Sequence, residues 1–354
     1  MNNKIRVLIV DDSALVRKTI TDVLSMDPDI EVVGTANDPL IAMEKIPLLL
    51  PDVMTLDMEM PRMDGLTYLR QLKAQGSSIK VVVISSLTQQ GSQIAFDAME
   101  AGAIEVLAKP DGQMSVGALS GKLAFHVKAA ANSRRRFYQP RAQSTPSPAR
   151  SALTTPGSVD RRLVVIGAST GGVEALRYLL PQLPDGLPPI LVVQHIPAFF
   201  SKAVAQRFDS LTAYQVREAV DDEPLRPGLC LIAPGDYHLM VVMKNGVYRT
   251  RLTQSPALHH CRPAVDLLFR SAAEVAGPHV VALLLTGMGS DGAMGMQTIA
   301  RAGGTTLAEH EDSCVVYGMP RAAIELGAVK HIVPLDGMAQ ALLKSIQETR
   351  KPHD

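Results

Sequence analysis

The chain has 354 residues, of which 46% are hydrophobic, and its formal net charge at pH 7 is zero. This length exceeds what one ordinary hydrophobic core holds, so two globular domains are expected. The balanced charge, the absence of Trp and an aromatic content of only 4% argue against a nucleic-acid partner.

In the first third of the chain, short apolar runs alternate with helical patterns. The expected strands are 6–10, 30–34, 53–56, 81–84 and 103–107, with helices such as 13–26 and 65–74 between them. Alternation of strand and helix predicts an α/β domain with a parallel, doubly wound sheet. Ligands of such a sheet bind at the carboxyl ends of its strands.

Polar residues follow four of these strands. Asp11 and Asp12 end the first strand and Asp57 ends the third, so their carboxylates converge at one sheet edge. Converging carboxylates repel one another unless a cation joins them, and oxygen ligands with open positions suit Mg²⁺ and a phosphate group. Ser85 and Lys109 end the fourth and fifth strands, where they are placed to hold phosphoryl oxygens. Taken singly, each residue also fits a helix cap or an ion pair.

These residues, together with Met-Pro-Arg-Met-Asp-Gly at 60–65, resemble the receiver domain of response regulators. The resemblance covers about the first 125 residues and implies a flavodoxin-like (βα)5 fold. It implies that Asp57 accepts a phosphoryl group from a histidine kinase. One departure from the family is Val106, which stands where many receivers carry an aromatic switch residue.

The receiver resemblance also assigns the remaining polar residues. Asp11, Asp12 and Asp57 would hold Mg²⁺, to which Glu59 contributes its backbone carbonyl. Ser85 and Lys109 would sense the phosphoryl group.

The composition changes between about Ser133 and Val159, where Pro, Ser and Arg occur without apolar periodicity. Such a segment cannot bury enough apolar surface to fold, which indicates an exposed linker. We expect a receiver domain at 1–125, a linker at 126–160 and a second domain at 161–354.

The second domain repeats the α/β alternation, with Gly and Pro at the joins between elements. Its expected strands are 163–166, 190–194, 229–233, 239–243, 280–285 and 305–308. This pattern predicts a second doubly wound and mostly parallel sheet.

Ser169 lies in a Gly-rich loop, 167–172, between the first of these strands and a helical pattern. A helix N-terminus surrounds the hydroxyl with free backbone N–H groups, which suits a nucleophile whose intermediate is an oxyanion. Two other interpretations remain, a helix cap and a dinucleotide loop. The spacing is not G-x-G-x-x-G, however, and His195, rather than an acidic residue, ends the next strand.

A serine nucleophile needs a base and a group that orients the base. His195 and Asp291, the latter in a Gly-rich loop after another strand, would meet Ser169 at one sheet edge. Individually, His195 also fits a strand-end histidine and Asp291 a helix cap. The order Ser, His, Asp differs from that of α/β-hydrolases, which argues against that fold but not against the chemistry.

The chain as a whole resembles the chemotaxis protein-glutamate methylesterases of the CheB type. The resemblance covers nearly all of it apart from the linker. Besides the serine loop, the matching blocks are Val-Gln-His-Ile-Pro at 193–197, Ile-Ala-Pro-Gly at 232–235, and the segments 262–269, 286–289 and 313–320.

This resemblance implies Ser169 as nucleophile, His195 as general base and then acid, and Asp291 as the orienting carboxylate. The backbone N–H of Met288 would bind the oxyanion, with Thr170 as a second contributor. The implied substrate is a γ-glutamyl methyl ester on the cytoplasmic helices of a chemoreceptor, which yields methanol and glutamate. Deamidation of receptor glutamines passes through the same kind of intermediate. Hydrolysis would need no cofactor.

The implied partners are a chemotaxis histidine kinase and methyl-accepting chemoreceptors, so the protein would meet the membrane only through receptors. We expect the unphosphorylated receiver to block the Ser169 site. A phosphorylation-dependent binding module and a nucleotide-dependent oxidoreductase remain alternatives.

The sequence also indicates a cytoplasmic protein. No apolar run would span a membrane, and the N-terminal residues do not form a signal peptide. The three cysteines have no CxxC spacing, which fits a reducing compartment. His259, His260 and Cys261 form a compact candidate metal cluster, but neighbours in sequence seldom converge on one ion, so a metal is not expected there.

Overall fold

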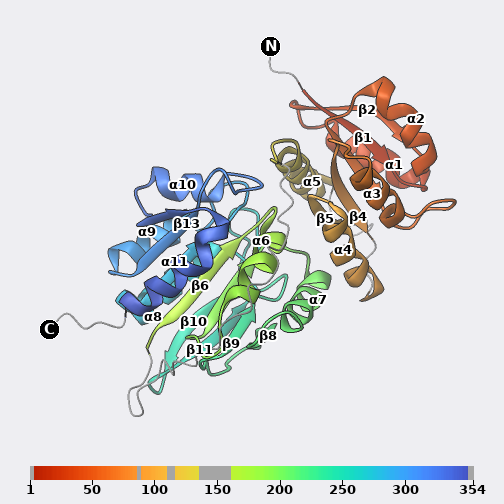
Figure 1. Ribbon diagram of the computed structural model, residues 1–354. Coiled ribbons are helices and arrows are strands. Elements are labelled where there is room, and N and C mark those ends of the chain that lie inside the picture. The colour runs from red at the N-terminus through yellow and green to blue at the C-terminus, as the bar shows by residue number, and fades with distance from the viewer. Residues whose placement is uncertain (1–3, 86–88, 110–115, 135–160, 350–354) are drawn as a thin grey trace. The chain divides into compact units, whose positions relative to one another are not determined.

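A computed structural model describes residues 4–85, 89–109, 116–134 and 161–349. The chain divides after Arg134 into two compact units, and each is considered by itself (Figure 1). Most of the predicted linker, residues 135–160, lies outside the described residues.

The first unit contains a parallel sheet of five strands in the order β2-β1-β3-β4-β5. All five predicted strands are present, although the last begins two residues later than expected, at Glu105. The strands are β1 (Ile5–Val10), β2 (Ile30–Ala36), β3 (Val53–Asp57), β4 (Lys80–Ser85) and β5 (Glu105–Ala108).

Helices connect these strands and cover both faces of the sheet (Figure 1). Three of them begin where Ser13, Asp38 and Asp64 accept hydrogen bonds from backbone N–H groups of the first turn. Apolar residues of α1 and α5 pack in one cluster with alternate residues of β1 and β4. The helices are α1 (Ala14–Leu24), α2 (Pro39–Leu49), α3 (Gly65–Ala74), α4 (Gln89–Ala101) and α5 (Val116–Ala131).

The end of α5 differs from the expected domain boundary. The sequence placed the end of the first domain at residue 125, but α5 continues to Ala131 and the first compact unit ends at Arg134. The reason is physical, because Val127 and Ala130 of this helix are fully buried in the core.

The second unit is built on a parallel sheet of seven strands in the order β14-β13-β12-β6-β7-β9-β8. The predicted strand 239–243 exists but pairs antiparallel in a hairpin outside this sheet. The sheet strands are β6 (Leu163–Ala168), β7 (Ile190–Gln194), β8 (Gln215–Glu218), β9 (Leu229–Ile232), β12 (Val280–Leu284), β13 (Thr305–Glu309) and β14 (His331–Val333); the hairpin is β10 (His238–Lys244) and β11 (Val247–Thr253).

Helices lie on both faces of this sheet (Figure 1). On one face, α8, α9, α10 and the β10–β11 hairpin pack in a single apolar cluster against β6, β7 and β12, whereas α6 and α11 contact each other elsewhere. The helices are α6 (Gly172–Leu179), α7 (Ala198–Asp209), α8 (Val265–Ala276), α9 (Ala293–Arg301), α10 (Met319–Glu325) and α11 (Leu335–Glu348), with short 3-10 turns η1 (Leu180–Gln182) and η2 (Gly277–His279). The prediction of a doubly wound, mostly parallel sheet is confirmed.

The strand order of the second unit creates a reversal beside β6. From β6 the chain adds β7 on one side and later returns to add β12 on the other. In open α/β sheets, the crevice at the carboxyl ends of such a pair is where ligands bind. The loops after β6, β7 and β12 carry Ser169, His195 and Asp291.

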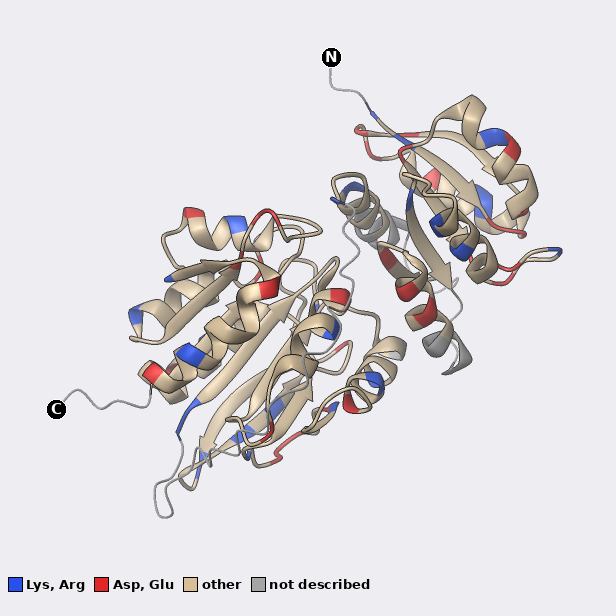
Figure 2. Ribbon diagram, in the orientation of Figure 1, with Lys and Arg blue, Asp and Glu red and all other residues tan. Residues whose placement is uncertain are grey.

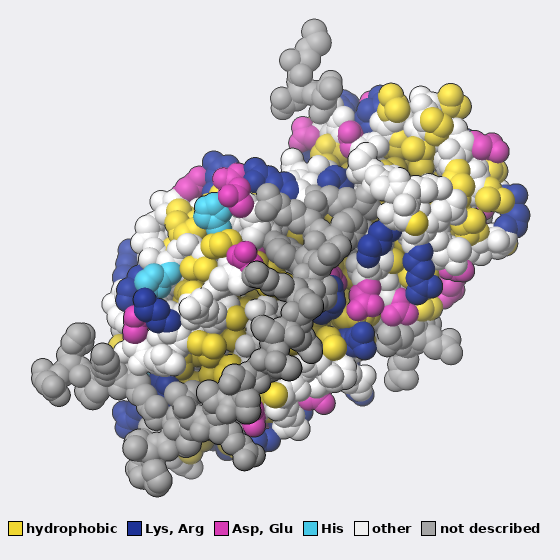
Figure 3. Space-filling model, viewed as in Figure 1, with side chains coloured by type: hydrophobic (Ala, Val, Ile, Leu, Met, Phe, Trp, Pro, Cys, Tyr) yellow, Lys and Arg dark blue, Asp and Glu magenta, His cyan; other side chains and the backbone are white. Residues whose placement is uncertain are grey.

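Charge on the described surface is mixed in sign. Figure 2 shows acidic and basic residues interspersed along the helices of each unit. Among hydrophobic side chains, Leu40, Leu48 and Leu50 are exposed on and just after α2, where Figure 3 shows a group of hydrophobic atoms. Within the described residues, none of the helices combines the length and apolar character needed to cross a bilayer.

Candidate functional site

Ser169 is held in a tight turn between β6 and α6. Its N–H donates to the carbonyl of Thr286 at 3.0 Å, and its own carbonyl accepts from Gly172 N–H at 2.7 Å. The chain can turn here because Gly171 adopts a φ of 80°, which favours glycine. Ser169 is 1% exposed, yet its Oγ has no hydrogen-bond partner among the described residues. Helix α6 has no side-chain cap, so the interpretation of Ser169 as a helix cap is wrong.

A second glycine makes room for the serine side chain. A Cβ added to Gly287, on the loop after β12, would lie 2.7 Å from the Cβ of Ser169 and 2.3 Å from Sδ of Met319. Real Cβ atoms do not approach other atoms so closely, so this position requires glycine. The loop after β12 therefore lies directly against Ser169.

His195 and Asp291 are joined, as the sequence predicted. Nε2 of His195 lies 2.8 Å from Oδ2 of Asp291. The carboxylate is fixed by the N-terminus of α8, since Oδ2 also accepts from Val265 N–H at 2.8 Å and Oδ1 accepts from Asp266 N–H at 2.9 Å. Burial alone would raise the pKa of Asp291, but the bonds from His195 and from these two N–H groups hold it below its ordinary value. Asp291 thus caps α8 and orients His195 at the same time.

The second nitrogen of His195 faces a residue to which the sequence analysis gave no catalytic part. Sγ of Cys261 lies 3.5 Å from Nδ1 of His195, and no hydrogen bond joins His195 to Oγ of Ser169. Burial favours the neutral imidazole, but Cys261 and Asp291 outweigh it and raise the pKa of His195 to about 10. The structure therefore brings His195 and Asp291 together and leaves Ser169 unbonded beside them.

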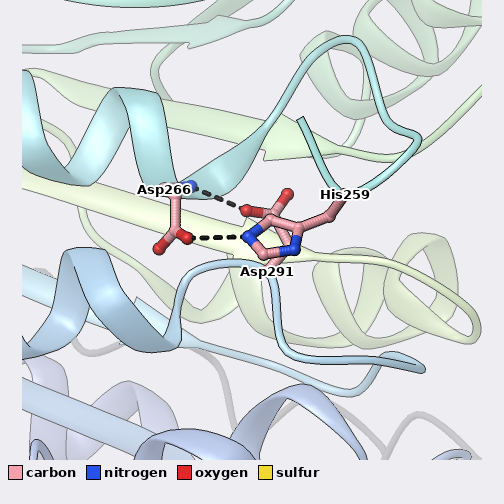
Figure 4. A group of neighbouring side chains, drawn as sticks. All are labelled: His259, Asp266 and Asp291. Carbon is pink, nitrogen blue, oxygen red and sulfur yellow. Dashed lines mark hydrogen bonds and ion pairs between the residues drawn. The ribbon is translucent and has the colours of Figure 1, made fainter. Parts of the chain in front are cut away.

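Asp266 and Asp291 cross-link two helices, and Figure 4 shows the part of this link in which Asp291 accepts from the N–H of Asp266. While Asp291, just before α9, caps α8, Oδ1 of Asp266 in α8 accepts from Gly295 N–H in the first turn of α9 at 2.6 Å. Oδ2 of the fully buried Asp266 also lies 3.0 Å from Nε2 of His259. Ligand atoms of His259, Asp266 and Asp291 lie within 4.8 Å of one another, but helix N–H groups already occupy both carboxylates. His259 and Cys261 point to different partners, so the compact cluster considered in the sequence does not converge.

Two backbone N–H groups are available to an oxyanion. Those of Thr170 and Met288 have no acceptor among the described residues. Thr170 precedes α6, and Met288 stands between Gly287 and Gly289 on the loop beside Ser169. The hydroxyl of Thr170 is also buried without a partner. Both N–H groups thus lie on the two loops that flank Ser169, and their contribution to an oxyanion site stays a prediction.

Gln194 supports the serine loop and was not assigned a part by the sequence analysis. Its Nε2 donates to the carbonyl of Ser169 at 2.9 Å, and its Oε1 is buried without a partner. A Cβ at Gly172 would lie 2.1 Å from that oxygen, so the amide needs glycine opposite it. In the sequence, the position of Gln194 at the end of the predicted strand, next to His195, could have indicated that it supports the site.

The acidic residues of the first unit converge as predicted. Carboxylate atoms of Asp11, Asp12 and Asp57 lie within 4.8 Å of one another. Nζ of Lys109 lies 2.6 Å from Oδ2 of Asp57 and 3.4 Å from Oδ2 of Asp11. Burial raises the pKa of Asp57, although Lys109 opposes the shift. Ser85 is buried at the end of β4, where its carbonyl accepts from Lys109 N–H at 2.8 Å.

These groups fit a hard divalent cation. Oδ2 of Asp11 is buried and accepts no hydrogen bond among the described residues, and all three side chains offer carboxylate oxygens. Glu59 contributes a backbone contact here, since its N–H donates to Oδ1 of Asp57 at 3.3 Å. The site therefore has the ligand chemistry expected for Mg²⁺.

Comparison with protein families gives two matches. Residues 7–116 match the response regulator receiver domain, and residues 164–342 match the CheB methylesterase. The chain belongs to the CheB methylesterase family. Relatives match nearly its whole length, including a protein-glutamate methylesterase/protein-glutamine glutaminase of Bdellovibrio bacteriovorus that is 44% identical over 98% of this chain and 99% of its own.

Other members of the CheB family agree with this assignment. A protein-glutamate methylesterase/protein-glutamine glutaminase of Syntrophus aciditrophicus is 44% identical over 97% of this chain and all of its own. The catalytic domain of the CheB methylesterase of Thermotoga maritima has 42% identity and a TM-score of 0.52, and covers 52% of this chain and 99% of that domain. The predicted order of a receiver followed by a CheB methylesterase domain is thus confirmed.

Proposed function

We propose that this CheB-family chain hydrolyses γ-glutamyl methyl esters on methyl-accepting chemoreceptors, and deamidates glutamines there, under the control of phosphorylation at Asp57. The observation that carries the proposal is the His195–Asp291 pair at 2.8 Å, beside the unpartnered hydroxyl of Ser169. Backbone N–H groups of α8 already hold the carboxylate of Asp291 in place, as a group that orients His195 requires.

In the proposed reaction, Oγ of Ser169 attacks the ester carbonyl carbon while His195 takes the hydroxyl proton. The carbonyl oxygen becomes an oxyanion, which the free N–H groups of Met288 and Thr170 stabilise. His195 then gives the proton to the ester oxygen, or to the amide nitrogen of a glutamine, and the C–O or C–N bond breaks to release methanol or ammonia. In the second half, His195 takes a proton from water while the water oxygen attacks the acyl-serine. The proton then passes to Oγ of Ser169, and glutamate is released. Asp291 remains ionised and holds the imidazolium.

In the receiver, Asp57 would accept a phosphoryl group from a chemotaxis histidine kinase. Asp11, Asp12 and Asp57, with the backbone carbonyl of Glu59, would hold Mg²⁺, which supplies positive charge to the phosphoryl oxygens. Ser85 and Lys109 would contact the phosphoryl group. Phosphorylation would release a restraint on the esterase, and a coupling of about 1–3 kcal/mol corresponds to about 5–150-fold activation. Because the substrate groups are on the cytoplasmic part of receptors, the chain would act in the cytoplasm.

Methanol release from methylated receptor membranes, with and without a small-molecule phosphodonor, tests this function. Wild type should release methanol faster with the phosphodonor, and Ser169→Ala should release none. A binding module without catalysis would show no difference between the two chains. An oxidoreductase would bind a nicotinamide cofactor and show no esterase activity.

The restraint by the receiver has its own test. A fragment that begins at about Arg161 should be more active than the unphosphorylated full chain. If the fragment is no more active, the receiver does not restrain the esterase.

A further inference from the structure

Residues 258–261 form a two-residue turn in a costly backbone conformation. Leu258 and Cys261 exchange two backbone hydrogen bonds, of 3.1 and 2.9 Å. The two residues between them, His259 and His260, have φ values of 52° and 61°. A turn with two left-handed residues favours Gly and Asn, and residues with a larger side chain adopt it only when their surroundings enforce it.

The side chain of His259 supplies that constraint. Its Nε2 lies 3.0 Å from the fully buried carboxylate of Asp266 in the first turn of α8 (Figure 4). The turn is therefore fastened to the same helix end that holds Asp291. Backbone strain of this kind gathers at functional sites.

The fastened turn directs Cys261 at the catalytic base. Sγ of Cys261 lies 3.5 Å from Nδ1 of His195, whose Nε2 is bonded to Asp291. Cys261 and Asp291 are the titratable groups that raise the pKa of this imidazole. Both ring nitrogens are thus engaged, while Oγ of Ser169 is buried without a partner.

We propose that Cys261 is a positioning residue that competes with Ser169 for Nδ1 of His195 and so holds the esterase below its full rate. While Sγ of Cys261 lies against Nδ1, the ring nitrogen that must take the serine proton is occupied. The contact also favours the protonated ring, which cannot act as a base. Ser169 is therefore activated only when the contact with Cys261 breaks. The inference rests on the proposed function of the Ser169 site.

The test compares full-length wild type, Cys261→Ala and Cys261→Ser by kcat/KM for receptor methyl-ester hydrolysis across pH, with phosphodonor present. Cys261→Ala should raise kcat/KM at neutral pH roughly 2- to 10-fold, the factor for one net hydrogen bond. It should also move the acidic limb of the profile to lower pH, because the base loses a neighbour that favours its protonated form. Cys261→Ser, whose hydroxyl oxygen can accept a hydrogen bond from the protonated ring, should return both toward wild type.

Cys230→Ala is the matched control, since it also removes a thiol, which in this case is buried. Cys230 lies on β9 beside Ile190, at the end of β7 that is farther from His195. This substitution should leave the pH profile unchanged. An unchanged or lower kcat/KM with an unchanged acidic limb in Cys261→Ala would overturn the proposal.

A second measurement does not depend on turnover. In full-length Ser169→Ala, the imidazole of His195 is titrated by NMR with and without Cys261→Ala. The pKa of His195 should fall when the thiol is removed, and an unchanged pKa would overturn the proposal. Failure of the proposed function is distinct, because it would appear as no methyl-ester hydrolysis by wild type, or as equal hydrolysis by Ser169→Ala.

Discussion

Replacing Asp291 by Asn affects both tasks of this carboxylate, which orients His195 and caps α8. In the native chain, Oδ2 accepts from His195 and from Val265 N–H, and Oδ1 accepts from Asp266 N–H. An Asn side chain has one oxygen and one NH₂ group, so in either orientation its NH₂ meets a donor. One orientation turns the NH₂ toward His195 and Val265, and the other turns it toward Asp266.

The substitution should lower both kcat and the free energy of unfolding. Loss of the negative charge beside the imidazolium should lower kcat by about 10²–10⁴-fold, as expected for the carboxylate of a serine triad. One unsatisfied buried N–H at the end of α8 should lower the free energy of unfolding by about 1–3 kcal/mol. Both quantities are measured on the same preparation, by methanol release and by urea unfolding.

Asp266→Asn provides the comparison. Asp266 is equally buried, and its side chain holds α9 and His259 without touching His195. It should lower the free energy of unfolding by a similar amount but not reproduce the large loss of kcat. If Asp266→Asn lowers kcat as much as Asp291→Asn, the loss reflects disturbed packing, and the assignment of Asp291 as the orienting carboxylate is refuted.

Three further predictions concern other parts of the chain. Asp57→Asn should abolish stimulation by the phosphodonor and leave the unstimulated rate of methanol release unchanged; residual stimulation would place the phosphoryl group elsewhere. Gly287→Ala should lower kcat more than tenfold, because its Cβ would press on Ser169 and Met319; a wild-type kcat would show that the loop yields. Burial raises the pKa of Glu309 from 4.5 to about 7, so its neutral form is favoured in the fold, and the free energy of unfolding should fall by about 3 kcal/mol as pH rises from about 4.5 to 7. Glu309→Gln should remove this slope in urea unfolding at pH 5 and pH 8, and an equal slope in both chains would contradict the shift.

The central strands of both sheets were predictable because parallel strands buried on both faces are continuous apolar runs. β8 and β14 lie at the edges of the seven-stranded sheet, with sequences Gln-Val-Arg-Glu and His-Ile-Val, and such short or polar runs carry little signal. β10 was recognised as a strand, but its partner was not, since local pattern does not encode pairing. The first domain was ended too early, at residue 125, because the local pattern does not reveal that α5 still packs into the core at Val127 and Ala130.

The candidate site was predictable where it depends on strand ends. Ser169, His195 and Asp291 were found because parallel strands bring their carboxyl ends to one edge. The contact between Cys261 and His195 depends instead on a turn with two left-handed histidines, a conformation that their residue type disfavours. The bond from His259 to the buried Asp266 explains that turn, and the position of Asp266 follows from tertiary packing.

The crossed carboxylates of Asp266 and Asp291 have a consequence for how mutations sort in this chain. Asp291 completes the N-terminus of α8, and Asp266 of α8 completes that of α9, so Asp291 is maintained by folding as well as by chemistry. The hydroxyl of Ser169 makes no hydrogen bond among the described residues, so it contributes no such bond to the stability of the fold. A library screened only for soluble expression should therefore lose Ser169 freely and keep Asp291. Inactive relatives that arise by drift would retain the aspartate long after the serine has gone.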